Sequence, residues 1–190
     1  MLRELVVKNR SCRRFYQAEK IEEKTLRQLV DLARLSASAG NLQSLKYILS
    51  CNGDKNAKIF KHLRWAAYLT DWPGPEEGER PAGYIVILGD TRIHKDFYCD
   101  HGIASQSILL GAVEKGLAGC IFASIDRDGL RESLNIDPSL EILLVIAIGR
   151  PKEKVVLEKV RQDGDIKYWR DSEGVHHVPK RELEEIILKD

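Results

Sequence analysis

The sequence predicts a single domain in which helices alternate with strands, of the α/β or α+β class. Two continuous apolar runs, Tyr84–Leu88 and Ile142–Ile148, are typical of buried strands. Helical patterns lie before, between and after these runs, without an internal repeat or a low-complexity stretch. The chain has 190 residues, of which 43% are hydrophobic and 31% charged. That length suffices for one domain with its own core, and the apolar content excludes intrinsic disorder.

The first predicted elements are a helix, a loop and a strand. Residues 22–35 repeat apolar side chains at helical spacing and carry two glutamates at the start, which suit the positive end of a helix. The short-side-chain stretch 36–41 predicts a loop, and residues 47–49 predict a strand.

A second helix is predicted from a cap at Asp54 to about Leu69. The Trp-Pro-Gly-Pro sequence at 72–75 then breaks the chain, and a polar loop continues to Pro81.

The segment between the two apolar runs is predicted to hold two helices and a strand. A helix over 100–116 shows a face of mixed small and large residues and ends at a glycine, and residues 118–125 predict a strand. A short helix follows over 127–134. The run Ile142–Ile148 is the most apolar of the chain, so we expect it to be a central strand.

The C-terminal tail is predicted to be a small hairpin-like unit followed by a helix. Residues 166–170 and 175–178 predict two short strands, and a last helix is expected from about Lys180. Two such strands cannot form a core alone, so we expect residues 160–190 to pack on a partner subunit.

The charge is balanced overall, with a formal net charge of +1, but it is unevenly distributed. Residues 1–14 and 150–161 are rich in Lys and Arg, whereas residues 71–80 carry an acidic excess. The overall balance disfavours a nucleic-acid partner, while the two basic segments could converge on one small anion. No apolar run approaches the ~20 residues of a membrane span, and the N-terminus does not resemble a secretory signal. A cytoplasmic location is expected.

The cysteines and histidines do not predict a metal site. Cys12, Cys51, Cys99 and Cys120 are scattered without a CxxC pair, so we expect reduced and mostly buried thiols. His176 and His177 are adjacent, so on a strand they point to opposite faces and cannot bind one ion together.

The N-terminal sequence offers a candidate anion site. Arg10 and Arg13 are three residues apart with Ser11 between them, so one turn could present two guanidinium groups and a hydroxyl to a phosphate. The alternative is an ordinary solvated basic N-terminus.

The loop over 36–41 offers a second candidate site. Its short side chains let a flat ligand approach the backbone, and Ser38, Asn41 and Gln43 supply uncharged donors that suit the edge of a heterocycle. It could also be a plain connector. Trp65 and Trp72 are candidates for a substrate pocket, although aromatic side chains more often anchor a core. Motifs for a Rossmann site, a phosphate-binding P-loop or a serine nucleophile elbow are missing from the sequence.

Four motifs in order resemble the nitroreductase family of FMN-dependent oxidoreductases. Residues 9–15 (NRSCRRF) resemble the family's basic opening, and 36–44 (SASAGNLQS) resemble its cofactor loop. The helix from Asp100 with its following glycine turn and the Gly149-Arg150-Pro151 sequence resemble the central helix and the end of the last core strand. The agreement spans about residues 5–155.

This resemblance implies an α+β fold with a central mixed β-sheet flanked by helices, in one domain over 1–190, assembled as an intertwined homodimer. Bound FMN, NADH or NADPH as electron donor, and a small acceptor such as a nitroaromatic or a quinone, in a ping-pong cycle, are implied as well. In such a cycle the flavin carries the chemistry, and no side chain acts as an obligatory acid or base.

The resemblance also implies the residues that contact the cofactor. They come from the basic opening, from the loop of the neighbouring subunit, from the strand beside the flavin ring and from one basic residue of 150–161, with Arg161 as second choice for the last: Arg10, Ser11, Cys12, Arg13, Ala37, Ser38, Ala39, Asn41, Ile121, Phe122, Ala123, Ser124 and Lys154. Gln43, Trp65 and Trp72 are expected in the substrate pocket.

The sequence departs from the family pattern at several of these places. Asn9 stands where a basic residue is usual, and Ala37, Ser44 and Leu45 replace the loop's prolines and tryptophan. The acceptor therefore does not follow from the resemblance. Two alternatives stay open: a flavin-binding relative with other chemistry, such as dehalogenation or flavin fragmentation, and a non-enzymatic module that binds a nucleotide.

Overall fold

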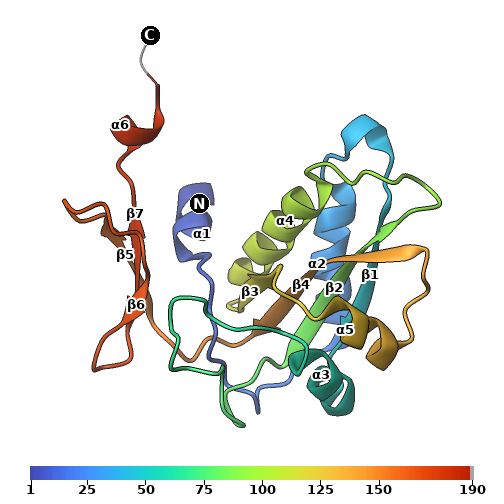
Figure 1. Cartoon of the computed structure of the whole chain (residues 1–190), viewed down its shortest axis with the longest axis horizontal. Coiled ribbons are helices and arrows are strands. Elements are labelled where there is room, and N and C mark those ends of the chain that lie inside the picture. Colours follow the sequence, from blue (N-terminus) through green and yellow to red (C-terminus); the bar gives the residue numbers. More distant parts are fainter. Residues whose placement is uncertain (189–190) are drawn as a thin grey trace.

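A four-stranded sheet in the order β1–β2–β4–β3 forms the centre of the protein (Figure 1). The structure is a computed structural model and describes residues 1–188. The strands are β1 (Leu45–Ser50), β2 (Gly83–Asp90), β3 (Ala118–Phe122) and β4 (Leu140–Gly149), and neighbours pair antiparallel. An isolated parallel bridge between Ser11 and Gly119 places the N-terminal segment along β3, so this edge of the sheet has a parallel neighbour.

The two predicted apolar runs are the two inner strands of this sheet. Every residue of β2 is buried, and β4 is buried over its second half. Because side chains alternate between the faces of a strand, each inner strand feeds two cores. One core joins Ile85 and Ile146 to α2 and α4, and the other joins Tyr84 and Val145 to α3 and α5.

Four helices cover the sheet, two on each face (Figure 1). They are α2 (Glu23–Leu35) and α4 (Asp100–Glu114) on one face, and α3 (Gly53–Phe60) and α5 (Arg127–Leu134) on the other. Helices α2 and α4 touch closely at Gly111, where a Cβ atom would lie 2.3 Å from a methyl carbon of Leu32. The sequence predictions for α2 and α5 are confirmed.

The predicted helix over 54–69 is too long. Helix α3 ends at Phe60, and its cap is Asn52, whose side chain accepts the Lys55 N–H at 3.1 Å. Beyond the helix, Leu63 forms an antiparallel bridge with Ile125 and Trp65 is buried in the core. These tertiary contacts extend the chain where its local pattern favoured a helix.

Other elements also differ from the sequence predictions. Helix α1 (Leu2–Lys8) and strand β5 (Val155–Lys159) form in the two basic segments, for which no element was predicted. Strand β3 ends at Phe122, earlier than the predicted 118–125.

The tail forms a second, three-stranded sheet beside α1 (Figure 1). Its strands β5, β6 (Trp169–Arg170) and β7 (His176–Lys180) are in the order β5–β7–β6, and the short helix α6 (Leu183–Ile186) follows. Within one chain, Arg170 stacks on Trp72 at 4.7 Å and pairs with Glu153 at 2.9 Å. Packing of the tail on a partner stays a prediction. Over residues 1–188, no helix has the length and apolarity needed to cross a membrane.

Candidate functional site

The segment after α1 is held along the edge of the central sheet. The Cys12 N–H donates to the Gly119 carbonyl at 3.0 Å, and the buried Cys12 and Phe15 side chains anchor the segment. Ser11 and Arg13 flank Cys12, and both line a cavity. The extended backbone therefore separates anchoring from ligand-facing side chains.

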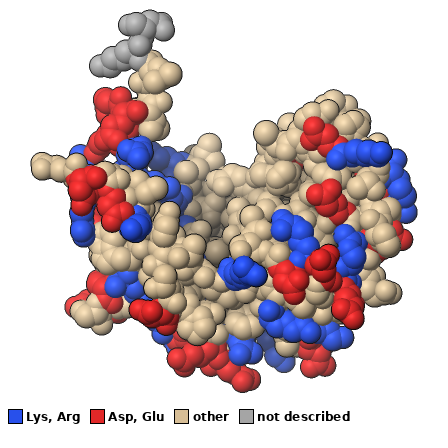
Figure 2. Space-filling model, in the orientation of Figure 1, with Lys and Arg blue, Asp and Glu red and all other residues tan. Residues whose placement is uncertain are grey.

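This cavity, called here the cationic cavity, has a volume of about 260 Å³. It lies between β3, α4 and the tail, where Figure 2 shows the surface hollowed. Among residues 1–188, its walls carry three cations and no carboxylate: Asn9, Arg10, Ser11, Arg13, Gln106, Leu109, Gly119, Ile121, Tyr168, His176, Val178 and Lys180. The structure thus brings together Arg10, Ser11, Arg13 and Ile121 of the predicted cofactor residues.

Arg13 is held by the tail. It is only 8% exposed, its guanidinium lies 4.7 Å from the centre of the Tyr168 ring, and its Nη1 is 3.2 Å from His176 Nε2. Burial lowers the pKa of His176 to about 4, with the cations Arg13 and Arg170 acting in the same direction and the Glu153 carboxylate opposing. His176 is therefore neutral at pH 7, so its Nε2 accepts a hydrogen bond from Arg13.

The Arg10 guanidinium is only partly hydrogen-bonded within residues 1–188. One of its terminal nitrogens donates to the Val6 carbonyl at 2.8 Å, and burial lowers the pKa of the guanidinium. Its Nε is buried and has no hydrogen-bond partner within residues 1–188. A buried donor without an acceptor is costly, so this nitrogen favours an anionic ligand in the cavity.

The basic residue that joins this site from the tail is Lys180, which lines the cavity. Lys154 is not part of the lining, and its carbonyl accepts the His176 N–H at 2.8 Å. Arg161 stacks on Trp169 at 4.8 Å, on the tail sheet.

Glu153 connects the two ends of the chain beneath the cavity. Its side chain is fully buried, accepts the backbone N–H groups of Arg13 and Arg14, and pairs with Arg170. A neighbouring network joins Glu79 to Arg14 at 2.5 Å and to Lys152 at 2.8 Å, and these partners lower the pKa of Glu79 to about 2. The backbone of Arg13 is thus held by Glu153, and its guanidinium is held by Tyr168 and His176.

A second cavity, called here the loop cavity, lies at the predicted cofactor loop. Its volume is about 160 Å³, and its lining comes from the end of α2, the loop, β1 and the start of α4: Arg34, Ser36, Ala37, Ser38, Asn41, Gln43, Leu45, Tyr47 and Asp100. The predicted residues Ala37, Ser38, Asn41 and Gln43 are therefore together, and Ala39 contributes its backbone nearby.

Asp100 fixes the shape of this loop. Its carboxylate accepts the Ser38 hydroxyl at 2.6 Å and the Ala39 N–H at 2.9 Å. Asn41 and Gln43 adopt φ values of 55° and 52°, in the left-handed region that non-glycine residues rarely occupy. A backbone held in this conformation indicates a shaped surface rather than a plain connector.

The two cavities lie at separate places along α4 and share no lining residue. Gln106 lines the cationic cavity, whereas Asp100, nearly two turns earlier, lines the loop cavity. Within one chain the loop residues and the Arg10–Arg13 segment therefore do not form one site.

The remaining predicted residues occupy other positions. Cys12 is an anchor, and burial raises the pKa of its thiol far above the ordinary value. Phe122 packs into the core, whereas Ala123 and Ser124 are exposed beyond the end of β3. Of the four free cysteines, Cys12 and Cys120 are buried and Cys99 is exposed.

The two tryptophans line neither cavity. Trp65 is 9% exposed and packs edge-on against Phe122 at 4.6 Å and Trp72 at 6.2 Å. The Arg170 guanidinium stacks on the Trp72 ring. This arrangement makes Trp65 a core residue and Trp72 the contact between its loop and the tail.

Sequence reasoning missed Gln106, Tyr168, His176 and Lys180. The predicted alternation of His176 and His177 across a strand is present in β7, and it places His176 in the lining of the cationic cavity. The other, His177, bonds Glu158 at 2.5 Å and Asp171 at 3.0 Å on the opposite face. No cluster of three potential metal ligands occurs within residues 1–188.

Comparison with known proteins settles the family. The family model described as "Nitroreductase family" matches residues 6–150, which include the central sheet and the N-terminal segment that lines the cationic cavity. The chain belongs to the nitroreductase family. The resemblance inferred from its motifs is therefore confirmed, and this nitroreductase-family chain is an oxidoreductase.

Individual relatives agree with this assignment. The Bacillus subtilis (strain 168) protein named "Putative NAD(P)H nitroreductase MhqN" is 26% identical, over 78% of this chain and 87% of that protein. A nitroreductase family protein from Streptococcus pneumoniae TIGR4 has a TM-score of 0.73 at 16% identity, over 100% of both chains. The FMN-dependent nitroreductase from Clostridium difficile R20291 has a TM-score of 0.64 at 22% identity, over 79% and 87%. These structures support the predicted α+β fold of this nitroreductase-family chain.

Proposed function

We propose that this protein is an FMN-dependent oxidoreductase that transfers electrons from NADH or NADPH to a small organic acceptor, such as a nitroaromatic or a quinone, in a ping-pong cycle. When bound, FMN supplies the hydride and electron chemistry. The observation that carries the proposal is the convergence of Arg10, Arg13 and Lys180 on one cavity without a carboxylate. The buried, unpartnered Nε of Arg10 fits a phosphate group there.

The chain's own residues divide the work of holding the cofactor. We assign Arg10, Ser11, Arg13 and Lys180 to the phosphate, with Lys180 in place of Lys154. Tyr168 and His176 position Arg13 through the stacking and hydrogen bond described above. Ile121 is 40% exposed at the mouth of the cavity and is assigned to the flavin ring together with the backbone of 122–124.

The second part of the proposal is a homodimer. The cationic cavity is smaller than the roughly 300–1,000 Å³ of complete ligand pockets. Apolar side chains on α1 and α4 stay exposed beside it, among them Leu2 (67%), Val6 (40%) and Ile103 (39%). A second copy covering them could bring its loop cavity to the cationic cavity, with Ala37, Ser38, Ala39, Asn41 and Gln43 facing the ligand.

The proposal is tested with the purified chain and FMN. Bound flavin gives the protein an absorbance band near ~450 nm. Arg13→Ala removes a charge-assisted bond of ~1.5–3 kcal/mol, so FMN should bind about 10–150-fold more weakly. Arg161→Ala, on the outer face of the tail sheet, is the matched control. Colourless protein that does not take up added FMN would refute the proposal, and equal affinity in both variants would remove Arg13 from the site.

The acceptor and the donor are identified by steady-state assays with NADH and NADPH against a nitroaromatic, a quinone and free flavin. Parallel lines in double-reciprocal plots are expected for the ping-pong cycle. Intersecting lines would instead require both substrates to be bound together.

A further inference from the structure

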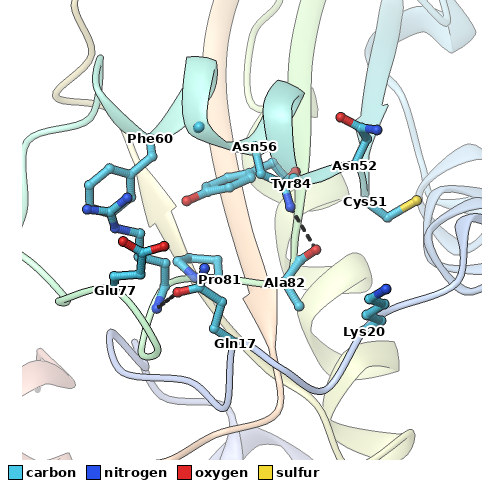
Figure 3. Close-up of a pocket in the computed structure, with 13 residues that line it drawn as sticks. Gln17, Lys20, Cys51, Asn52, Asn56, Phe60, Glu77, Pro81, Ala82 and Tyr84 are labelled. Carbon is cyan, nitrogen blue, oxygen red and sulfur yellow. Dashed lines mark hydrogen bonds between the residues drawn. The ribbon is translucent and has the colours of Figure 1, made fainter.

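A third cavity lies on the opposite face of the sheet from α2 and α4, between α3 and the loop that precedes β2 (Figure 3). Its volume is about 490 Å³, which falls within the range of small-molecule pockets. It shares no lining residue with the cationic cavity or the loop cavity. The proposed flavin site leaves this cavity without a role.

Hydrogen bonds tie the walls of this cavity to the surrounding elements. The Asn56 amide donates to the Ala82 carbonyl at 2.8 Å and accepts the Ser50 hydroxyl at 2.7 Å, which fixes α3 to the end of β1 and to the residue before β2. On the other side, the Gln17 side-chain oxygen accepts the N–H groups of Gly78 at 2.8 Å and Arg80 at 3.1 Å. A ligand would therefore meet a preformed surface, which limits the entropy lost on binding.

Two donors in this surface have no acceptor within residues 1–188. The hydroxyl of Tyr84, a residue only 1% exposed, is buried and unpartnered, and so is Nε of Arg80. In Figure 3 the Tyr84 hydroxyl points toward the end of the cavity where Phe60 and Glu77 lie. Buried polar groups in native proteins are rarely left unsatisfied, so both atoms indicate a missing acceptor.

The charges around the cavity favour an anion. Arg80 and Lys20 line it and form no ion pair within residues 1–188. Glu77 is the one acidic side chain of the lining; it is exposed, and the two cations outweigh it. The first residue of α3, Gly53, also lines the cavity, and the positive end of that helix adds to the field.

The apolar part of the lining favours a flat body on the ligand. The Arg80 guanidinium stacks over the Phe60 ring at 4.5 Å, and Pro81, Ala82 and the Tyr84 ring complete an apolar wall. Stacked arginine presents its remaining face and its edge nitrogens to a ligand. An aromatic ring with a carboxylate matches both properties of this surface.

We propose that this cavity is a second small-molecule site, separate from the flavin site, which binds a planar organic carboxylate through Tyr84, Arg80 and Lys20. The carboxylate accepts from the Tyr84 hydroxyl and the Arg80 guanidinium, and the ring lies against Pro81 and the Arg80–Phe60 stack. The site does not depend on the proposed function, because none of its residues belongs to either of the other cavities.

The test is calorimetric titration of the full-length protein with benzoate, benzamide and acetate. Benzoate should bind with one site per chain. Benzamide lacks the charge and acetate lacks the ring, so each should bind at least about tenfold more weakly. Equal affinity of benzoate and benzamide, or no saturable binding of benzoate, would overturn the proposal.

Tyr84→Phe locates the site. It removes only a hydroxyl that has no partner in the described part of the chain, so the fold should be kept, and benzoate should bind about tenfold more weakly. Lys20→Met should weaken binding about threefold, while Tyr98→Phe, an exposed tyrosine elsewhere, should have no effect. Benzoate binding that shifts the flavin absorbance and is unchanged in Tyr84→Phe would place the ligand at the flavin and overturn the proposal.

Discussion

The adjacent histidines of β7 should make opposite contributions to stability as the pH falls. His176 is fully buried and has a pKa of about 4, well below its ordinary 6.5, chiefly because burial disfavours the imidazolium. His177 has its pKa raised by hydrogen bonds to Asp171 and Glu158. We therefore expect one residue to destabilise the folded protein in mild acid and its neighbour to stabilise it.

The sign and size for His176 follow from linkage. Above pH 6.5 the imidazole is neutral in both the folded and the unfolded chain, so it has no pH-dependent effect. Below pH 6.5 the unfolded chain takes up the proton first, so the free energy of unfolding falls until about pH 4. The difference between the two pKa values corresponds to about 3 kcal/mol at full effect.

The sign for His177 is the reverse. Its raised pKa means that the folded protein binds the proton more tightly, so its stabilising contribution is full below the ordinary pKa and is lost as the pH rises through the folded one.

Urea denaturation at several pH values between 4 and 7.5, the range in which the lowered pKa of His176 and the raised pKa of His177 act, measures both effects. His176→Asn should flatten the loss of stability below pH 6.5, and His177→Asn should steepen it. His94→Asn, in the loop before α4, is the control. A His176 ring that titrates at its ordinary pKa by NMR, or a His176→Asn profile parallel to that of the unsubstituted protein, would refute the reasoning.

Three other outcomes are expected. Lys180→Met should weaken FMN binding about tenfold or more in a fluorescence titration, and Lys154→Met should not, because only the former side chain lines the cationic cavity. Trp65→Ala should lower the free energy of unfolding by ~3–5 kcal/mol in urea, since it opens a cavity among three aromatic rings. Ile103→Glu should yield monomers by light scattering and reduce FMN affinity as well, and a variant that stays dimeric would contradict the interface on α4.

Periodic and apolar patterns predicted several elements of the central domain, whose side chains are buried in its two cores. The β2 and β4 runs, the α2 stripe and the short α5 all form where their patterns indicate. Each is buried in one of the two cores, so the local preference and the tertiary environment agree.

The sequence misled where distant contacts decide the local conformation. The stretch after Phe60 favours a helix, but Leu63 pairs with Ile125, more than sixty residues away. Strand β5 exists because His176 and its neighbours on β7 pair with it. Such pairings leave no periodic trace in the segment itself.

In the cationic cavity the sequence indicated residues of the N-terminal segment and Ile121 of β3, but none of the tail. Arg10 and Arg13 stand out by charge and spacing, whereas Lys180 and Tyr168 reach the cavity through the path of the tail. The family resemblance implies a basic residue from 150–161, with Lys154 preferred by its register; the Lys154 carbonyl accepts the His176 N–H, and Lys154 is not among the residues that line the cationic cavity.

The buried Glu153 also has a consequence for how the protein is made. Residues 9–15 emerge from the ribosome early in synthesis. The Glu153 carboxylate that holds the Arg13 and Arg14 backbone lies about 140 residues later in the sequence, and His176 lies later still. Contacts so distant in sequence form late and slow folding. The basic segment therefore stays unassembled until the tail has been made, and under the proposed function FMN would bind only after that step.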